Sequence, residues 1–154
     1  MASPKLFRHR QSKIGSFYAI TAVTNRRISL FTDIRAAHAV IHEIIDCENE
    51  GFVDSHAWVV MPDHVHWLIE LRCGSLKVCL QRFKSRSARA IHSKLGTSGG
   101  IWQPGFYDHY IRSDEDLRMQ AQYIVMNPVR AGIVVKPEDY PYQWSRWIRS
   151  FANL

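Results

Sequence analysis

Two apolar segments, 52–61 and 64–71, are separated only by Pro62 and Asp63. Both segments are rich in β-branched and aromatic residues, which favour strands. A connection this short makes the two strands run in opposite directions, so the sequence predicts an antiparallel hairpin.

Four further segments surround the hairpin. Residues 15–24 and 106–111 carry aromatic and β-branched side chains and are predicted as strands, whereas apolar residues at three- and four-residue steps predict helices over 34–50 and 76–95. The resulting order is β-α-β-β-α-β. It predicts an α+β fold of the ferredoxin-like type, with an antiparallel sheet, helices on one face, and the other face free to meet a partner.

A third, C-terminal helix follows the last of these strands. Ser113 is a suitable N-cap, because acidic residues follow it in what would be the first helical turn. The helix is expected to run to about Asn127, where Pro128 stops or kinks it. This helix bears Tyr123.

Length and composition bound the classes of protein that fit. The 154 residues suit one domain, with a basic N-terminal arm at 1–13 and an aromatic C-terminal tail at 136–154. A net charge of +6 favours an anionic partner, with nucleic acid first. The longest apolar runs are too short to cross a membrane. Three cysteines without a C-x-x-C spacing, and no sign of a signal peptide, indicate a cytoplasmic protein.

His64 and His66 lie two residues apart on the second strand of the hairpin. Side chains alternate along a strand, so both imidazoles are expected on one face, with their Cα atoms roughly 7 Å apart. Two imidazoles at this spacing can bind one metal ion and leave coordination positions open for a substrate. The alternative is that both histidines only occupy a half-exposed strand.

Tyr123 and Asn127 are four residues apart on the third helix and so share a face, with Gln120 beside them. A protonated phenol is a poor nucleophile, but a divalent cation and local positive charge would make its attack on a phosphate practical. Asn127 can lend its carbonyl oxygen as a third metal ligand. The alternative is a surface tyrosine followed by an Asn-Pro helix stop.

Together these two pieces resemble the single-tyrosine HUH transposases, and most closely the REP-associated tyrosine transposases of bacteria. The resemblance rests on blocks that lie in order along the chain: MPDHVHW at 61–67, WQPGFYD at 102–108, YIVMNPVRAG at 123–132 and YPYQWS at 140–145. It spans most of the chain, from about residue 15 to residue 145.

The resemblance implies a metal-dependent reaction on single-stranded DNA, of the kind used in DNA transposition and recombination. Tyr123 would attack a phosphodiester, form a 5′-phosphotyrosine and leave a free 3′-hydroxyl. A DNA 3′-hydroxyl would later displace the tyrosine and rejoin the strands. His64, His66 and Asn127 would hold Mg²⁺ or Mn²⁺ on the scissile phosphate. Insertion-sequence relatives usually carry a glutamine where Asn127 stands.

The resemblance also implies a setting for the reaction. The substrates would be single-stranded DNA with REP-type hairpins, and the protein would be bacterial and nucleoid-associated when bound to DNA. We expect a monomer, although insertion-sequence relatives are homodimers whose tyrosine helix is supplied in trans. Asp63 and Gln120 are expected to support the metal ligands, with turn formation as the alternative role of Asp63.

Basic side chains outside these blocks are candidates for contacts with the DNA backbone. They lie in the N-terminal arm and along the second helix: Lys5, Arg8, Arg10, Arg82, Lys84, Arg86 and Arg89. Such contacts release counterions and therefore weaken with salt. The alternative is an ordinary solvated helix face.

Two other functions fit the same residues. A metal phosphodiesterase that uses water, with Tyr123 only positioning the substrate, would leave a free 5′-phosphate and no covalent species. A non-catalytic, domesticated hairpin-binding protein, acting on DNA or RNA, would bind without breaking the strand.

Overall fold

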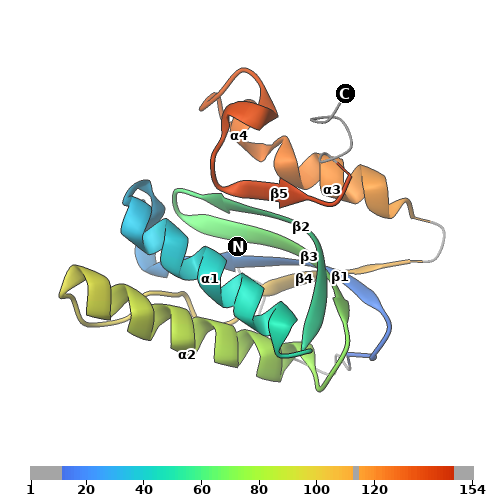
Figure 1. Cartoon of the computed structure of the whole chain (residues 1–154), viewed down its shortest axis with the longest axis horizontal. Coiled ribbons are helices and arrows are strands. Elements are labelled where there is room, and N and C mark those ends of the chain that lie inside the picture. The colour runs from blue at the N-terminus through green and yellow to red at the C-terminus, as the bar shows by residue number, and fades with distance from the viewer. Residues whose placement is uncertain (1–11, 113–114, 148–154) are drawn as a thin grey trace.

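The computed structural model describes residues 12–112 and 115–147. Its centre is a five-stranded antiparallel sheet in the order β4-β1-β3-β2-β5 (Figure 1). The strands are β1 (Phe17–Val23), β2 (Val53–Met61), β3 (His64–Leu71), β4 (Tyr107–Ile111) and β5 (Gln143–Ser145). The predicted hairpin is confirmed as β2 and β3, which pair from Val53 with Leu71 to Met61 with His64.

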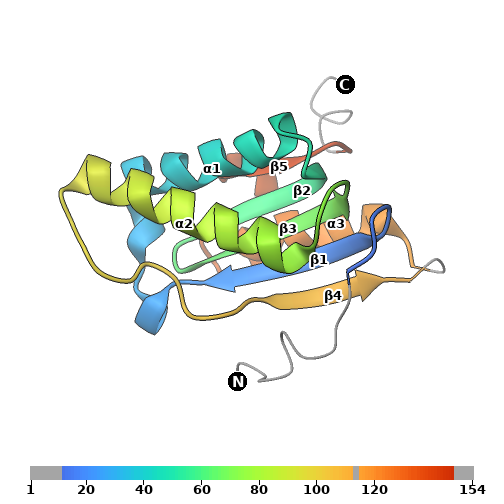
Figure 2. The same ribbon diagram turned by 90° about the horizontal axis from the view of Figure 1, so that it is seen from below.

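Helices cover both faces of this sheet. Two long helices, α1 (Ile34–Asn49) and α2 (Leu76–Leu95), lie side by side on one face (Figure 2). The shorter α3 (Leu117–Val125) and α4 (Asn127–Arg130) lie on the other face (Figure 1). The predicted α+β, ferredoxin-like plan is therefore confirmed, with the tyrosine-bearing helix as an addition to it. Within the described part of the chain, no helix is long and apolar enough to cross a membrane.

Local signals explain where the helices begin and end. The Asp33 side chain caps α1 by accepting a hydrogen bond from the Arg35 amide at 2.9 Å, and Ser75 caps α2 through the Val78 amide at 3.2 Å. Gly96 ends α2 with a left-handed backbone (φ 67°), a conformation that side chains on L-residues disfavour.

The alternation of side chains along β3 divides the apolar residues between two cores. Val65, Trp67 and Ile69 pack in the core beneath α1 and α2, where the Trp67 indole also donates a hydrogen bond to Ser55 Oγ at 2.8 Å. Leu68 points to the opposite face and packs in a smaller core with Ile124 of α3. This second core holds the tyrosine helix against the sheet.

The third helix differs from the prediction at both ends. It begins at Leu117, where the Asp116 side chain accepts a hydrogen bond from the Arg118 amide at 2.9 Å, so Asp116 is the cap. The predicted cap, Ser113, lies outside the described residues. The helix breaks after Val125 because Pro128 has no amide hydrogen to continue the ladder, and a separate turn, α4, follows.

Two expectations about the surface were wrong. The sheet face opposite α1 and α2 is not free, because α3 and α4 pack on it. The aromatic tail predicted at 136–154 is not all tail, because residues 143–145 add strand β5 to the edge of β2. Tyr140 is buried before it and donates a hydrogen bond from its hydroxyl to Val60 O at 2.5 Å. Residues 148–154 and most of the predicted N-terminal arm lie outside the described residues.

Candidate active site

His64 and His66 lie on the sheet face that α3 covers. Both have the same parity along β3 as Leu68, which packs in the α3 core, and the opposite parity to Trp67. The predicted shared face is therefore confirmed. The centroids of the two imidazole rings are 4.8 Å apart and the rings are nearly perpendicular. Two ring nitrogens at this separation can reach a common point above the strand.

Each imidazole is held by a hydrogen bond at Nδ1. His64 Nδ1 is 2.6 Å from Asp63 Oδ1, and His66 Nδ1 is 2.8 Å from Thr21 Oγ1 on the neighbouring strand β1. Neither Nε2 atom has a hydrogen-bond partner among the described residues. When Nδ1–H is the donor in both bonds, both Nε2 atoms present lone pairs, which is the arrangement in which histidines bind metal ions.

The electrostatic surroundings keep His66 neutral. Burial, with smaller contributions from the nearby His64 and Arg130, lowers the pKa of His66 to about 4. A neutral imidazole is the form that binds a metal ion. Burial raises the pKa of Asp63, but the hydrogen bond with His64 and the charge of Arg27 outweigh it, so this pKa lies below its usual value.

Asp63 contacts both the histidine that follows it and an arginine of the β1 turn. It lies in the turn between β2 and β3, and its carboxylate bridges two side chains. One oxygen contacts His64 and the other accepts from Arg27 Nε at 3.2 Å. Arg27, which follows β1, therefore fixes the carboxylate that orients His64.

Tyr123 is on the exposed side of α3, with 63% of its surface accessible. The Arg130 guanidinium carbon lies 3.8 Å from the centroid of the tyrosine ring, and Arg130 Nη2 donates to the Tyr123 carbonyl at 2.6 Å. Asn127 donates through Nδ2 to the carbonyl of Ile124 at 3.0 Å and, more weakly, to that of Tyr123 at 3.4 Å. Its Oδ1 atom has no hydrogen-bond partner among the described residues and is left as an acceptor.

Arg130 relates the tyrosine to the histidines. It touches the Tyr123 ring directly, and its charge contributes to the lowered pKa of His66. The helix that carries Tyr123 packs on β2 and β3, the two strands of the hairpin. The phenol and the imidazole pair thus belong to the same side of the sheet in a single chain.

The two histidines alone do not make a complete metal site. Among residues 12–112 and 115–147, no group of three or more His, Cys, Asp and Glu side chains is placed to hold a metal. A metal at His64 and His66 therefore needs another kind of ligand. The Asn127 amide oxygen, which the sequence suggested as the third ligand, is a candidate. Two imidazoles and a neutral oxygen fit a divalent cation whose other positions are filled by water and substrate oxygens.

Gln120 has a different partner from the one expected. Its Nε2 donates to Glu115 Oε2 at 3.1 Å, and the same oxygen lies 3.0 Å from His109 Nε2 on β4. The structure therefore ties Gln120 to this Glu115–His109 group, and shows no contact between Gln120 and the two histidines of β3.

The described basic residues that were predicted to bind DNA all lie on α2 and are separated from this site. Lys5, Arg8 and Arg10 lie outside the described residues.

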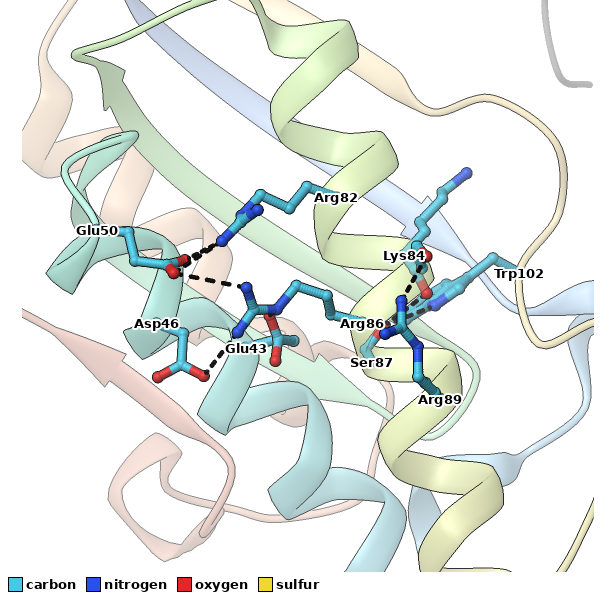
Figure 3. Close-up of polar contacts among 10 residues, drawn as sticks. Glu43, Asp46, Glu50, Arg82, Lys84, Arg86, Ser87, Arg89 and Trp102 are labelled. Carbon is cyan, nitrogen blue, oxygen red and sulfur yellow. Dashed lines mark hydrogen bonds and ion pairs between the residues drawn. The ribbon is translucent and has the colours of Figure 1, made fainter.

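On α2, beneath the opposite sheet face, Arg82 pairs with Glu50 at 2.7 Å and Arg86 with Glu43 at 3.0 Å (Figure 3). Glu43 lies on α1 and Glu50 directly follows this helix, so the charges of Arg82 and Arg86 are compensated within the protein. Among the residues that the structure describes, Arg89 makes only a long hydrogen bond to Ser85 Oγ, at 3.4 Å.

Lys84 has a structural partner in the 102–108 block. Its Nζ donates to the carbonyls of Gln103, at 2.8 Å, and Gly105. Trp102 donates from its indole to Ser87 Oγ at 3.0 Å, also on α2 (Figure 3). Burial lowers the pKa of Lys84 to about 8. These bonds fix the loop that leads into β4, and they leave Lys84 little freedom to reach a ligand.

The sequence reasoning missed Thr21, Arg27 and Arg130. Arg130 had a signal, because it lies seven residues after Tyr123, which is about two helical turns. Thr21 had none, since it pairs with His66 only through the register of β1 on β3. Arg27 depends in the same way on how the end of β1 meets the hairpin turn.

Comparison with known proteins defines the class. Residues 13–127 match the family model described as "Transposase IS200 like", so the chain belongs to this transposase family. It is 32% identical to the REP-associated tyrosine transposase of Escherichia coli K12 over 139 residues, which cover 88% of this chain and 79% of that protein. It also resembles the solved structure of the REP-associated tyrosine transposase bound to a REP hairpin. That match has a TM-score of 0.73 and 28% identity, and covers 99% of this chain and 86% of the other. The suspected resemblance is confirmed.

Proposed function

We propose that this transposase nicks and rejoins single-stranded DNA through a covalent Tyr123 intermediate, with a divalent metal ion bound at His64 and His66. The observation that carries the proposal is that α3, which bears Tyr123, packs on the two strands of the histidine hairpin, while Arg130 lies over the Tyr123 ring with 3.8 Å between its guanidinium carbon and the ring centroid. Nucleophile, positive charge and candidate metal ligands are thereby brought to one side of the sheet.

The chemistry assigned to the chain is a transesterification. The Tyr123 hydroxyl loses its proton as its oxygen bonds to the phosphorus of a phosphodiester, and the bond from phosphorus to the 3′-oxygen breaks. The released 3′-oxygen takes up a proton, so the products are a 5′-phosphotyrosine and a free 3′-hydroxyl. Arg130 is placed to favour the negative charge that develops on the phosphate. A second 3′-hydroxyl reverses the reaction and rejoins the strand.

Mg²⁺ or Mn²⁺ at His64, His66 and Asn127 would polarise the phosphate as a Lewis acid. Thr21 and Asp63 hold the two imidazoles in the orientation that exposes Nε2. Arg27 holds Asp63 in turn. The neutral state of His66 near pH 7 follows from its lowered pKa and suits this role.

The substrate is proposed to be DNA that carries a REP-type hairpin. The support is the solved relative, which is described as bound to a REP hairpin and matches this chain over nearly its whole length. We further propose that a monomer is active. The support is that Arg130, which touches the Tyr123 ring, also acts electrostatically on His66 of the same chain, and that α3 packs on the strands of the histidine hairpin.

The test is an adduct assay. Wild-type protein, Mn²⁺ and a labelled single-stranded hairpin DNA should give a species that survives denaturation and migrates with the protein. Tyr123→Phe should abolish it, and His64→Ala should reduce it strongly. Strand cleavage with a free 5′-phosphate and no adduct would show that water is the nucleophile instead. Tight binding that survives EDTA, without cleavage, would indicate a binding protein.

A further inference from the structure

The turn after β1 has an unusual backbone. Arg26 and Arg27 have φ values of 58° and 51°, and within the described residues they are the only positive-φ positions that are not glycine. The left-handed region is unfavourable for side chains of this size. Strained backbone of this kind persists where the surroundings enforce it, and it occurs preferentially at functional sites.

Hydrogen bonds attach this turn to the hairpin that carries the histidines. The Thr24 amide donates a hydrogen bond to Asp63 O at 3.0 Å. The Thr24 hydroxyl is shared between the same oxygen, at 3.0 Å, and Ile28 O, at 2.8 Å. Val23, the last residue of β1, pairs with His64. The two arginines therefore follow the C-terminal end of β1, its arrowhead in Figure 2, which lies beside the start of β3 at His64.

The charges of this turn are available to a ligand. Arg27 uses Nε for Asp63, and its side chain is 60% exposed, with no other partner for its terminal nitrogens among the described residues. Arg26 is exposed and has no acidic partner in the described part of the chain. Arg27 is paired with Asp63, whereas Arg26 contrasts with Arg82 and Arg86, whose charges are compensated by Glu50 and Glu43.

We propose that Arg26 and Arg27 form a binding site for the phosphodiester backbone of single-stranded DNA, next to the phosphate that Tyr123 attacks. This proposal rests on the proposed function for the location of the strand. Guanidinium groups recognise phosphate oxygens in a fixed fork geometry, and the left-handed turn presents two of them from adjacent positions. Arg27 also positions His64 through Asp63, so a phosphate on Arg27 lies directly beside the candidate metal site.

The left-handed backbone makes a sharp variant possible. In Arg26→Gly the guanidinium is lost, but glycine adopts φ near 58° freely, so folding should be unharmed or improved. Binding is measured by fluorescence anisotropy in a Tyr123→Phe background, which removes the covalent step. The two probes are a DNA hairpin with a single-stranded 5′ extension and the same hairpin with blunt ends. Arg72→Ala, at the far end of β3, is the control for loss of one positive charge.

Arg26→Gly should weaken binding of the tailed hairpin about tenfold and reduce the slope of log affinity against log salt by about 0.7, the value for one single-strand phosphate contact. Its melting temperature should not fall, and binding of the blunt hairpin should match that of Arg72→Ala. Unchanged affinity and slope on the tailed hairpin, or an equal loss on both probes, would overturn the proposal. Tighter, Arg26-dependent binding of an RNA tail would reject DNA as the ligand. Tyr123 adduct formation by otherwise wild-type protein is scored separately, so its absence would refute the proposed function alone.

Discussion

The guanidinium carbon of Arg130 lies 3.8 Å from the centre of the Tyr123 ring, and the same side chain bonds the Tyr123 carbonyl at 2.6 Å. Two contacts of different kinds fix the relation between these residues across the break between α3 and α4. The break at Pro128 is therefore part of the site, because it places Arg130 back over the tyrosine rather than farther along a straight helix.

Replacing Arg130 should slow the chemical step. Arg130→Ala removes the cation beside Tyr123, and the rate of adduct formation should fall by about 100-fold, as for the loss of one group that stabilises transition-state charge. Arg130→Lys should recover part of the rate. Single-turnover gel assays at saturating DNA measure this, with Arg72→Ala as the matched loss of charge. Equal rates for Arg130→Ala and Arg72→Ala would contradict the assignment.

Thr21 should matter for metal affinity and little for folding. Thr21→Val keeps the shape but removes the partner of His66 Nδ1, so Mn²⁺ affinity measured by calorimetry should fall roughly 10- to 100-fold. Thr97→Val is the matched control, because it breaks a 2.8 Å threonine–histidine contact, to His92, away from the site. If both variants bind Mn²⁺ equally well, Thr21 does not orient a metal ligand.

The free energy of unfolding should decrease as the pH is lowered in the acidic range, and His56 should contribute to this decrease. This residue is 5% exposed between Phe17 and Trp147, and neither ring nitrogen has a hydrogen-bond partner within residues 12–112 and 115–147. Burial lowers the pKa of His56 to about 4, with Arg146 adding to the effect. The unfolded chain therefore binds more protons between about pH 6.5 and pH 4, and the folded state loses stability as pH falls through this window.

His56→Leu should flatten this dependence. Urea unfolding at a series of pH values gives the number of protons taken up on unfolding. The variant should take up as much as one proton fewer than wild type. Above about pH 7, where His56 is neutral in both states, the slopes of the two proteins should agree. Parallel curves between pH 4 and pH 6.5 would show that His56 is not the responsible group.

Lys84 should affect stability more than DNA binding. Lys84→Met leaves the carbonyls of Gln103 and Gly105 without their donor, and the free energy of unfolding should drop by about 1–3 kcal/mol. The affinity for hairpin DNA should change no more than in Arg72→Ala. A large loss of affinity at full stability would restore the original prediction that Lys84 contacts the DNA backbone.

Local patterns predicted the parts of the fold that depend on local physics. The hairpin around Pro62, the two long helices and the shared face of His64 and His66 each follow from residue periodicity within one segment. The order β-α-β-β-α-β then left few topologies, and the ferredoxin-like one is observed.

The features that were missed depend on contacts between distant segments. The short strand β5 exists because residues 143–145 meet the edge of β2, which no pattern within three residues reveals. The basic face of α2 looked like a DNA-binding surface, since Glu50 and Glu43, which compensate Arg82 and Arg86, lie more than thirty positions away in sequence. Thr21 and Arg27 reach the site only through strand register and turn packing.

The central claim is that one chain brings the tyrosine and the histidines into a single site, and mixing two inactive variants tests it directly. Tyr123→Phe keeps the histidines and His66→Ala keeps the tyrosine, so neither should form an adduct alone. For a site completed within one chain, the mixture should also form none with Mn²⁺ and hairpin DNA. Recovery of the adduct on mixing would show that tyrosine and histidines come from different chains and would contradict the account.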